Sequence, residues 1–224
     1  MYQVQGVNQK ITPLQHTAEY YRRNPLVIEY QGIRLSRIFE ARRIFSHRGV
    51  LKVGYDLVSV LESLHSKSLV HGDIGPANVV IGAKGNGWLY LLDYGLASFY
   101  RDPESLHHYP QVPLFDRGGT SCFASLDRHR ALSLSRRDDM QSLGYMLAWL
   151  SCYGSLPWQD VRARTTQEMF HVTYQMKRVA SSNPNFFLLW PLPPGLREFF
   201  RLAFSLSFSD KPDYDAMRRA LQLR

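Results

Sequence analysis

The feature that most constrains this chain is an ordered series of polar residues around two short apolar runs. The first loop reads "HGDIGPAN" over residues 71–78, and "LLDYG" follows at residues 91–95. The apolar runs between these polar residues, at 79–81 and 88–92, have β character and are separated by the turn-rich "GAKGNG". Either loop alone is weak evidence, because a lone DxG is usually a turn. The complete order of HxDxxxxN, strand and DxG is specific.

Asp73, Asn78 and Asp93 are the side chains of this series that can carry chemistry. Transfer of a phosphoryl group from a nucleotide requires one carboxylate to orient the acceptor hydroxyl. It also requires oxygen ligands, one from an asparagine and one from an aspartate, to hold Mg²⁺ against the phosphates. The series therefore favours phosphoryl transfer. In the alternative interpretation, Asp73 and Asp93 only hold the backbone of their loops in place.

Length and composition limit the chain to one ordinary globular domain. It has 224 residues, of which 45% are hydrophobic and 13% aromatic, and this composition argues against disorder. The first residues lack the apolar run of a signal peptide, and no segment approaches the ~20 apolar residues of a membrane span. Cys122 and Cys152 have no metal-binding spacing. We therefore expect a cytoplasmic or nuclear protein with reduced thiols and no membrane contact.

The formal net charge is +8, from 27 Lys and Arg against 19 Asp and Glu. Arginines crowd two regions, residues 34–48 and residues 128–137. Such clusters attract nucleic acid, acidic peptides or phosphorylated proteins, but they also occur as solvated faces with structural ion pairs. Neither cluster is interleaved with exposed aromatics in the manner of single-strand binders. Nucleic-acid binding therefore stays an open alternative that charge alone does not support.

The apolar periodicity predicts an α+β fold that is mainly helical. Residues 26–30 are compatible with a buried strand, and residues 51–65 carry apolar side chains at helical spacing. Residues 96–135 are rich in proline and glycine, which predicts a long irregular segment with a functional role. Further helices are predicted from Asp138 onward, over 163–180, and after Pro194 and Pro212, with each of these two prolines in a first turn.

Several other segments, taken together with the two loops, resemble one protein family. "QGIRLSRIFEARR" looks like a hinge and the helix after it, "LHSKSLVHGDI" like the approach to a catalytic loop, and "GGTSCFASLDRH" like the end of an activation segment. "SRRDDMQSLGYML", "GSLPW" and "LSFSDKPDYDAMRRAL" continue the match. The chain thereby resembles the C-terminal lobe of protein kinases, and within them the Ser/Thr-directed casein kinase I and vaccinia-related kinase group.

The resemblance implies a domain organisation. Residues 1–25 would be a remnant of a truncated N-terminal lobe, and residues 26–224 would form a protein-kinase-like C-terminal lobe with a few short strands. In chain order, that lobe would contain the hinge at 29–33, the catalytic loop at 71–78, the metal turn at 93–95, the activation segment at 96–127 and a helical subdomain at 136–224.

The resemblance also implies roles for particular residues. Asp73 would be the catalytic aspartate, and Thr120 would steady it. Asn78 and Asp93 would bind the magnesium ion. Asp139, which opens a helix, would accept hydrogen bonds from the backbone of the catalytic loop. Besides Asp93, the gatekeeper, the hinge and the cleft floor would contact the nucleotide through Ile28, Glu29, Gln31 and Val80.

Departures from the family pattern concern the groups that stabilise phosphate charge. No glycine-rich GxGxxG loop and no VAIK-like lysine occur among the 224 residues. Gly75 stands where the resemblance implies a lysine for the γ-phosphate, and Ala77 stands where tyrosine-directed kinases place an arginine. Losing one preorganised charge-stabilising donor costs about 10²–10³ in rate. Gly72 also replaces an arginine of many kinases, but vaccinia-related kinases share this glycine.

These observations predict a pseudokinase that acts by binding a protein partner, such as the N-terminal lobe of a kinase or a kinase substrate. Activity is expected to be weak or lost, and an inactive protein would use no cofactor. The alternative is an active Ser/Thr protein kinase that uses Mg-ATP and transfers its γ-phosphate through Asp73. Without a covering lobe, the cleft floor around Val80 and Tyr94 is expected to expose a contiguous apolar surface, which would be the partner site.

Overall fold

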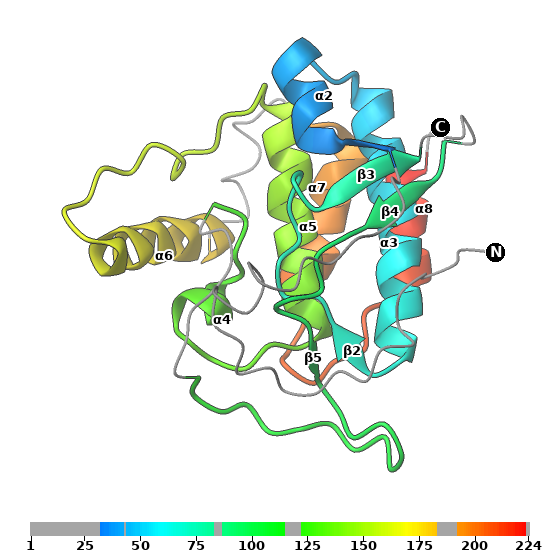
Figure 1. Cartoon of the computed structure of the whole chain (residues 1–224), viewed down its shortest axis with the longest axis vertical. Helices are drawn as coiled ribbons and strands as arrows, with labels where there is room; N and C mark the ends of the chain where they lie inside the picture. The colour runs from blue at the N-terminus through cyan, green and yellow to red at the C-terminus, as the bar shows by residue number, and fades with distance from the viewer. Residues whose placement is uncertain (1–31, 43, 83–86, 115–121, 183–191, 223–224) are drawn as a thin grey trace, which may run out of the picture.

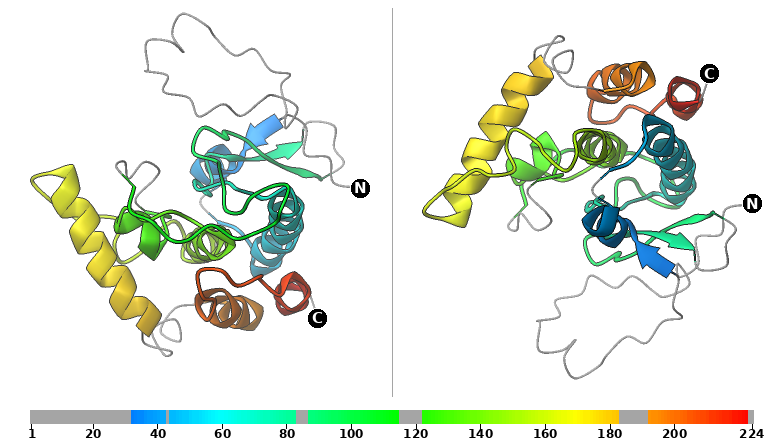
Figure 2. Two further views of the ribbon diagram at one scale, coloured as in Figure 1. Left: turned by 90° about the horizontal axis from the view of Figure 1, so that it is seen from below. Right: turned by 90° about the horizontal axis from the view of Figure 1, so that it is seen from above.

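Four helices from distant parts of the chain pack side by side at the centre of the fold (Figures 1 and 2). They are α3 (His47–Ser66), α5 (Arg136–Ser151), α7 (Pro194–Phe204) and α8 (Tyr214–Leu221). Helix α3 packs against α5 and α8, and α7 packs against the same two helices. The computed structural model describes residues 32–42, 44–82, 87–114, 122–182 and 192–222, and the predicted mainly helical α+β class is confirmed.

The core of this bundle follows directly from helical spacing in the sequence. Helix α3 buries an apolar side chain on nearly every turn, and α5 is buried on all sides. The fully buried side chains at the centre include Leu57, Leu61, Met140, Leu143, Leu147 and Phe199. Each such side chain stabilises the folded state by roughly 1.5–3 kcal/mol relative to exposure to water. The helix predicted at residues 51–65 is confirmed and is one turn longer at its N-terminus.

Side-chain caps define where the helices begin. The Ser46 side chain accepts a hydrogen bond from the backbone N–H of Gly49 at the start of α3. The Asp213 side chain accepts one from Ala216 at the start of α8, at 2.8 Å. Pro194 occupies the first turn of α7, as predicted. The same prediction is wrong for Pro212, because Asp213 is the N-cap of α8 and Pro212 therefore lies before the helix.

The strands form two small antiparallel sheets. The larger sheet has the order β1-β3-β4 and consists of β1 (Gly32–Arg34), β3 (Val79–Gly82) and β4 (Leu89–Leu91). In its register, Ile81 of β3 lies between Ile33 and Leu89. The smaller sheet pairs β2 (Leu69–Val70) with β5 (Ser98–Phe99). The strands predicted at 79–81 and 88–92 are confirmed to within a residue or so at each end.

The remaining helices flank the bundle. Helix α2 (Leu35–Arg42) follows β1 directly, and α6 (Thr166–Ser182) stands to one side, where it contacts the short α4 (Leu126–His129) (Figure 1). The fully buried Lys177 of α6 donates a hydrogen bond from its Nζ to the carbonyl of Ala124, at 2.7 Å. The helix predicted over 163–180 is confirmed with slightly later bounds. The described part of 96–135 is mostly irregular, as expected, but it also contains β5 and α4.

The prediction of an exposed apolar floor at Val80 is wrong. Val80 is only 2% exposed and Val79 is fully buried. Because consecutive strand residues point to opposite faces, both faces of the central strand β3 are covered at this point. Tyr94 is half-buried and packs against the main core.

Other sequence-based predictions fall outside the described residues. These are the N-terminal-lobe remnant at 1–25, the strand at 26–30 and the individual residues Ile28, Glu29, Gln31 and Thr120. In the described part of the chain, none of the helices combines the length and the apolar character that crossing a membrane requires.

Candidate active site

One buried carboxylate of helix α5 binds the backbone of residues 71–78, the predicted catalytic loop. Asp139, in the first turns of α5, is 1% exposed. Its Oδ2 accepts a hydrogen bond from the backbone N–H of His71 at 2.8 Å, and its Oδ1 accepts one from that of Gly72 at 2.9 Å. The position near a helix N-terminus further favours a negative charge. The role predicted for Asp139 is thus confirmed.

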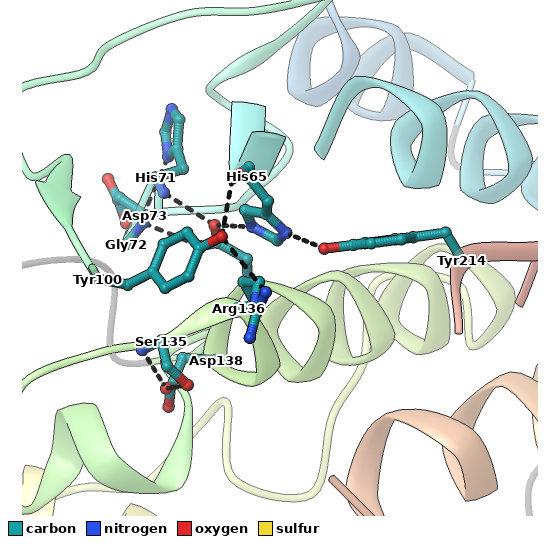
Figure 3. Close-up of polar contacts among 10 residues, drawn as sticks. His65, His71, Gly72, Asp73, Tyr100, Ser135, Arg136, Asp138 and Tyr214 are labelled. Atoms are coloured by element: carbon teal, nitrogen blue, oxygen red, sulfur yellow. Dashed lines mark hydrogen bonds and ion pairs between the residues drawn. The ribbon is translucent and has the colours of Figure 1, made fainter. Parts of the chain in front are cut away.

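His65 supplies a third donor to the same carboxylate. Its Nε2 lies 2.9 Å from Asp139 Oδ2, and its Nδ1 lies 2.8 Å from the hydroxyl of Tyr214 (Figure 3). In a neutral imidazole that donates from Nε2, Nδ1 accepts the hydrogen bond from Tyr214. The chain of contacts therefore joins α8, α3, α5 and the catalytic loop. Sequence reasoning missed His65 and Tyr214, because their contact joins two positions that are 149 residues apart in the chain.

The start of the predicted activation segment is held to the same region. The hydroxyl of Tyr100 donates to the backbone carbonyl of His65 at 2.9 Å and accepts from Nη1 of Arg136 at 3.3 Å (Figure 3). The Arg136 guanidinium also lies over the Tyr100 ring, 4.6 Å from its centroid, and its Nη2 donates to the carbonyl of Ser209 at 2.8 Å. Such a stacked, hydrogen-bonded arginine fixes the aromatic ring in one orientation.

The pKa values of two adjacent aspartates of α5, Asp138 and Asp139, are shifted in opposite directions. Burial alone would raise the pKa of Asp139, but the hydrogen bond from His65 and the electrostatic interactions with His65 and His71 hold that pKa below its usual value. Burial raises the pKa of Asp138 to about 7, and the hydrogen bonds from Ser125 and Ser135 only partly oppose this shift. Asp138 Oδ2 accepts the backbone N–H of Ser135 at 2.8 Å and so caps the helix (Figure 3).

His71 connects the catalytic loop to the metal turn. Its Nδ1 accepts a hydrogen bond from the backbone N–H of Asp73 at 3.2 Å, so its Nε2 donates to the carbonyl of Leu92, 3.0 Å away. Its ring also packs edge-on against Tyr94, with the centroids 5.1 Å apart. Burial, followed by the charge of Asp139, raises the pKa of Tyr94 to about 12. Tyr94 is therefore a neutral packing residue of the turn.

The structure brings Asp73 and Asn78 into direct contact. Nδ2 of Asn78 donates to the backbone carbonyl of Asp73 at 2.8 Å and to its Oδ2 at 3.0 Å. The carbonyl of Asn78 accepts from the N–H of Leu92 at 2.8 Å, which places this residue beside the turn that carries Asp93. Asp93 has a left-handed backbone conformation (φ 63°), and its Oδ1 accepts from the N–H of Gly95 at 3.2 Å.

These donors suit a magnesium ion. The amide of Asn78 points its nitrogen at Asp73, so its oxygen is the atom left for a metal, and Asp93 contributes an exposed carboxylate. Mg²⁺ prefers oxygen ligands and is commonly held by only one or two protein groups, with phosphates and water completing its shell. Across the described ranges, no three or more His, Cys, Asp and Glu side chains form a group that could hold a metal ion. Asn78 and Asp93 would therefore hold Mg²⁺ only together with a nucleotide.

An aromatic ring packs against Gly75, the loop position at which the family resemblance implies a lysine. Gly75 is buried, and a Cβ placed on it would lie 3.2 Å from Cδ2 of Phe123. Phe123 is itself 7% exposed and packs edge-on against Trp149, with centroids 5.8 Å apart. A side chain at position 75 could be accommodated only if this ring moved. Sequence reasoning missed this contact, because 48 residues separate the two positions.

Gly72 is glycine for a different reason. Its φ is +77°, and a Cβ there would approach the backbone oxygen of Leu96 to 2.9 Å. The guanidinium of Arg128 lies next to it, with Nη2 3.5 Å from the Gly72 carbonyl. A side chain at position 72, including an arginine, would therefore strain the backbone of this loop.

We predict that Asp139 matters for folding and Asp73 does not. Asp139→Ala leaves three donors without their acceptor, and each unsatisfied buried group costs about 1–3 kcal/mol. Urea denaturation should show a loss of roughly 3 kcal/mol or more. The matched variant Asp73→Asn keeps the shape of a half-buried side chain and should change stability by less than about 0.5 kcal/mol. Equal losses in both variants would contradict this division of roles.

We also predict a pH dependence that comes from Asp138. Its pKa of about 7 in the folded state lies above the ordinary value of 3.8, so its contribution to stability is complete below about pH 4. That contribution is lost as the pH rises towards 7, because only the unfolded state then releases the proton. The unfolding free energy of the wild type, relative to Asp138→Asn, should fall between pH 4.5 and pH 7. Parallel curves for the two proteins would show that Asp138 does not titrate in this range.

The model of the protein kinase domain matches residues 1–201, which is most of the chain. The matched range contains the loop 71–78, the turn 93–95 and helices α2 to α6, together with most of α7. The chain therefore belongs to the protein kinase family.

Proposed function

We propose that this protein kinase family member is a pseudokinase of the vaccinia-related and casein kinase I type, which acts by binding a protein partner. The observation that carries the proposal is the packing of Phe123 on Gly75. The loop 71–78 holds the aspartate and asparagine of the reaction but has no lysine or arginine. Phe123 fills the space into which a side chain at position 75 would extend.

The energetic consequence concerns the transition state. Phosphoryl transfer depends mostly on positioning and on stabilising charge at the phosphate oxygens, because the protein performs little covalent chemistry. Losing one preorganised donor of this kind costs about 10²–10³ in rate. The oxygen set of Asn78 and Asp93 supplies a site for Mg²⁺ but no replacement for a cation at position 75. Phosphotransfer by this chain should therefore be weak or absent.

A binding role is supported by the three-stranded sheet β1-β3-β4. Its outer strand β1 carries Ile33, which is 55% exposed, and Trp88, immediately before the other outer strand, is 44% exposed. Sheet edges with exposed apolar side chains are sites at which other chains add. The partner class that fits this surface is a protein, such as the N-terminal lobe of a kinase or a kinase substrate. We therefore propose this sheet edge as the partner surface in place of the region around Val80, because Val80 is buried.

The second candidate function is that of an active Ser/Thr protein kinase. It is favoured by the contact between Asn78 and Asp73 and by the presence of Asp93 in the following turn, because the reaction uses these residue types. In that case Asp73 orients the acceptor hydroxyl, Asn78 and Asp93 hold Mg²⁺, and Mg-ATP supplies the phosphoryl group. A cation from outside the loop 71–78 would then have to serve the γ-phosphate.

Nucleotide binding and phosphotransfer separate the two candidates. The purified chain should bind Mg-ATP weakly or not at all in a calorimetric titration, because the phosphates are held only through the metal. It should transfer no more label from γ-³²P-ATP to a mixture of acidic and basic substrate proteins than Asp73→Asn does. Micromolar affinity that disappears in Asp93→Ala, or transfer that disappears in Asp73→Asn, would establish the active kinase instead.

The binding role predicts a specific effect at the sheet edge. Ile33→Glu places a charge on β1 and should abolish the capture of a protein partner from cell extract, because an interface would have to bury that charge. Ile44→Glu is a matched control, since Ile44 is 64% exposed and lies after α2, outside the sheet. Near-UV circular dichroism should be the same for all three proteins. Capture that survives Ile33→Glu, or that both variants lose equally, would exclude the β1 edge as the contact.

A further inference from the structure

A cavity of about 580 Å³ lies next to the loop 71–78, on the side of the predicted activation segment. It is lined by residues from 95–100, 109–114 and 128–134, together with Phe208. The atoms nearest to a Cβ placed on Gly72 belong to lining residues, so the cavity borders the loop. Its volume lies within the range of roughly 300–1,000 Å³ that small-molecule sites occupy. Asp73, Asn78 and Asp93 do not line it, so it is separate from the candidate active site.

The cavity opens where the chain after residue 109 separates from β5. The N–H of Tyr109 donates to the carbonyl of Tyr100 at 3.0 Å, but Pro110 has no N–H with which to continue this pairing. Val112 pairs with Ser133 instead, because its carbonyl accepts the N–H of Ser133 at 2.8 Å and its N–H donates to the Ser133 Oγ at 2.9 Å. A gap therefore remains between β5 and the residues that follow Tyr109.

Strand β5 presents a backbone donor and a backbone acceptor to this gap. The N–H of Tyr100 donates to the carbonyl of Ser68 at 3.1 Å, and the next pair in the register is Leu69 with Phe99. Pairs of an antiparallel ladder alternate between those that exchange hydrogen bonds and those that do not, so the N–H and C=O of Phe99 face away from β2. They therefore face the side on which residues 109–114 and the cavity lie.

Large apolar side chains surround the cavity and remain exposed. Phe99, Tyr109, Val112 and Leu114 are 40%, 43%, 45% and 36% exposed. Phe208 forms another part of the lining. Single exposed apolar residues are ordinary on a protein surface, but a group of four around one cavity is typical of a ligand site. Because three of these five side chains are aromatic, the lining favours a planar aromatic ligand.

The polar side chains of the lining are already engaged by the protein. Nη2 of Arg128 lies 3.5 Å from the Gly72 carbonyl, to which it donates, and Arg128 is 6% exposed. The hydroxyl of Tyr100 donates to the carbonyl of His65, and that of Ser133 accepts the N–H of Val112. An ionised ligand would lose its water here without gaining a counter-charge that is not already in use. The cavity therefore favours a neutral ligand.

We propose that the cavity binds a neutral, planar aromatic lactam. Its amide N–H donates to the carbonyl of Phe99, its C=O accepts from the N–H of Phe99, and its rings lie against Tyr109 and Val112. An added peptide strand would need a row of open backbone groups. Only Phe99 of the two-residue β5 faces the gap, and the backbone of Val112 is paired with Ser133, so a single cis amide fits better. The inference is independent of phosphate transfer and of the β1 edge.

Isothermal titration calorimetry with three related compounds tests this proposal. The lactam 6-phenyl-2-quinolone should bind the wild-type chain with one-to-one stoichiometry. Its N-methyl derivative, which cannot donate to Phe99, should bind at least tenfold more weakly, and so should 6-phenylquinoline-2-carboxylate, which carries a charge. Equal affinity for the lactam and its N-methyl derivative would overturn the pairing with Phe99. Tighter binding of the carboxylate would overturn the neutral ligand class.

Two variants locate the bound lactam. Val112→Trp places a larger side chain at the cavity and should weaken the lactam at least tenfold. Val179→Trp makes the same change in α6, at a residue that is 59% exposed and outside the cavity, and should bind the lactam as the wild type does. Near-UV circular dichroism checks the fold of both variants, and Leu114→Trp replaces Val112→Trp if the latter does not fold. Lactam affinity that the cavity variant leaves unchanged, or no binding to the wild type, would overturn the proposal.

Discussion

The buried carboxylate of Asp139 is the interaction on which the arrangement of the site depends. A charge that is 1% exposed is strongly destabilising unless hydrogen bonds replace its water shell. Here the backbone N–H groups of His71 and Gly72 and the ring of His65 provide that shell. Because these donors come from the catalytic loop and α3, the requirement of one charge forces α5, α3 and the loop into a single geometry. Tyr214 extends the same constraint to α8 through His65.

This constraint separates the shape of the loop from its chemistry. Within the loop, Asp139 accepts hydrogen bonds from the backbone of His71 and Gly72, and the His71 ring in turn contacts the Leu92 carbonyl and the N–H of Asp73. None of these contacts involves the carboxylate of Asp73 or a cation at position 75. The loop therefore keeps its conformation whether or not phosphate is transferred, and an ordered loop is not by itself evidence of activity. Evidence on activity has to come from the groups that would contact the nucleotide.

The sequence predicted the parts of the fold that depend on local patterns. The helical spacing of α3, the hairpin of β3 and β4 and the N-terminal proline of α7 are all local signals, and all were confirmed. The prediction for Pro212 failed because proline is also compatible with the position before an N-cap, and only Asp213 distinguishes the two. The exposure predicted for Val80 failed because burial depends on what covers a strand, which spacing along the chain does not report.

The site shows the same division between local and tertiary information. Asp73, Asn78 and Asp93 belong to a motif, and the contact between the first two follows from their spacing within one tight loop. His65, Tyr214 and Phe123 reach the site through tertiary packing, so their roles are visible only in three dimensions. The cavity next to this loop likewise combines residues from 95–100 with residues near 110, 130 and 208. A single-sequence pattern contains no signal for such a combination.

Gly72 and Gly75 both depart from the pattern of many kinases, but the backbone conformation accounts only for Gly72. Gly72 has φ +77°, and a Cβ on it would lie 2.9 Å from the backbone oxygen of Leu96, so any other residue there would be strained. Gly75 has no left-handed backbone, and its nearest contact is the side chain of Phe123 at 3.2 Å. The loop backbone would therefore accept a lysine at position 75 once a smaller residue replaced Phe123. The missing cation is a consequence of side-chain packing between the loop and the segment before α4, and not a requirement of the backbone. Since that packing also buries Phe123 against Trp149, an exchange at position 75 alone would disturb the core before it could restore a charge.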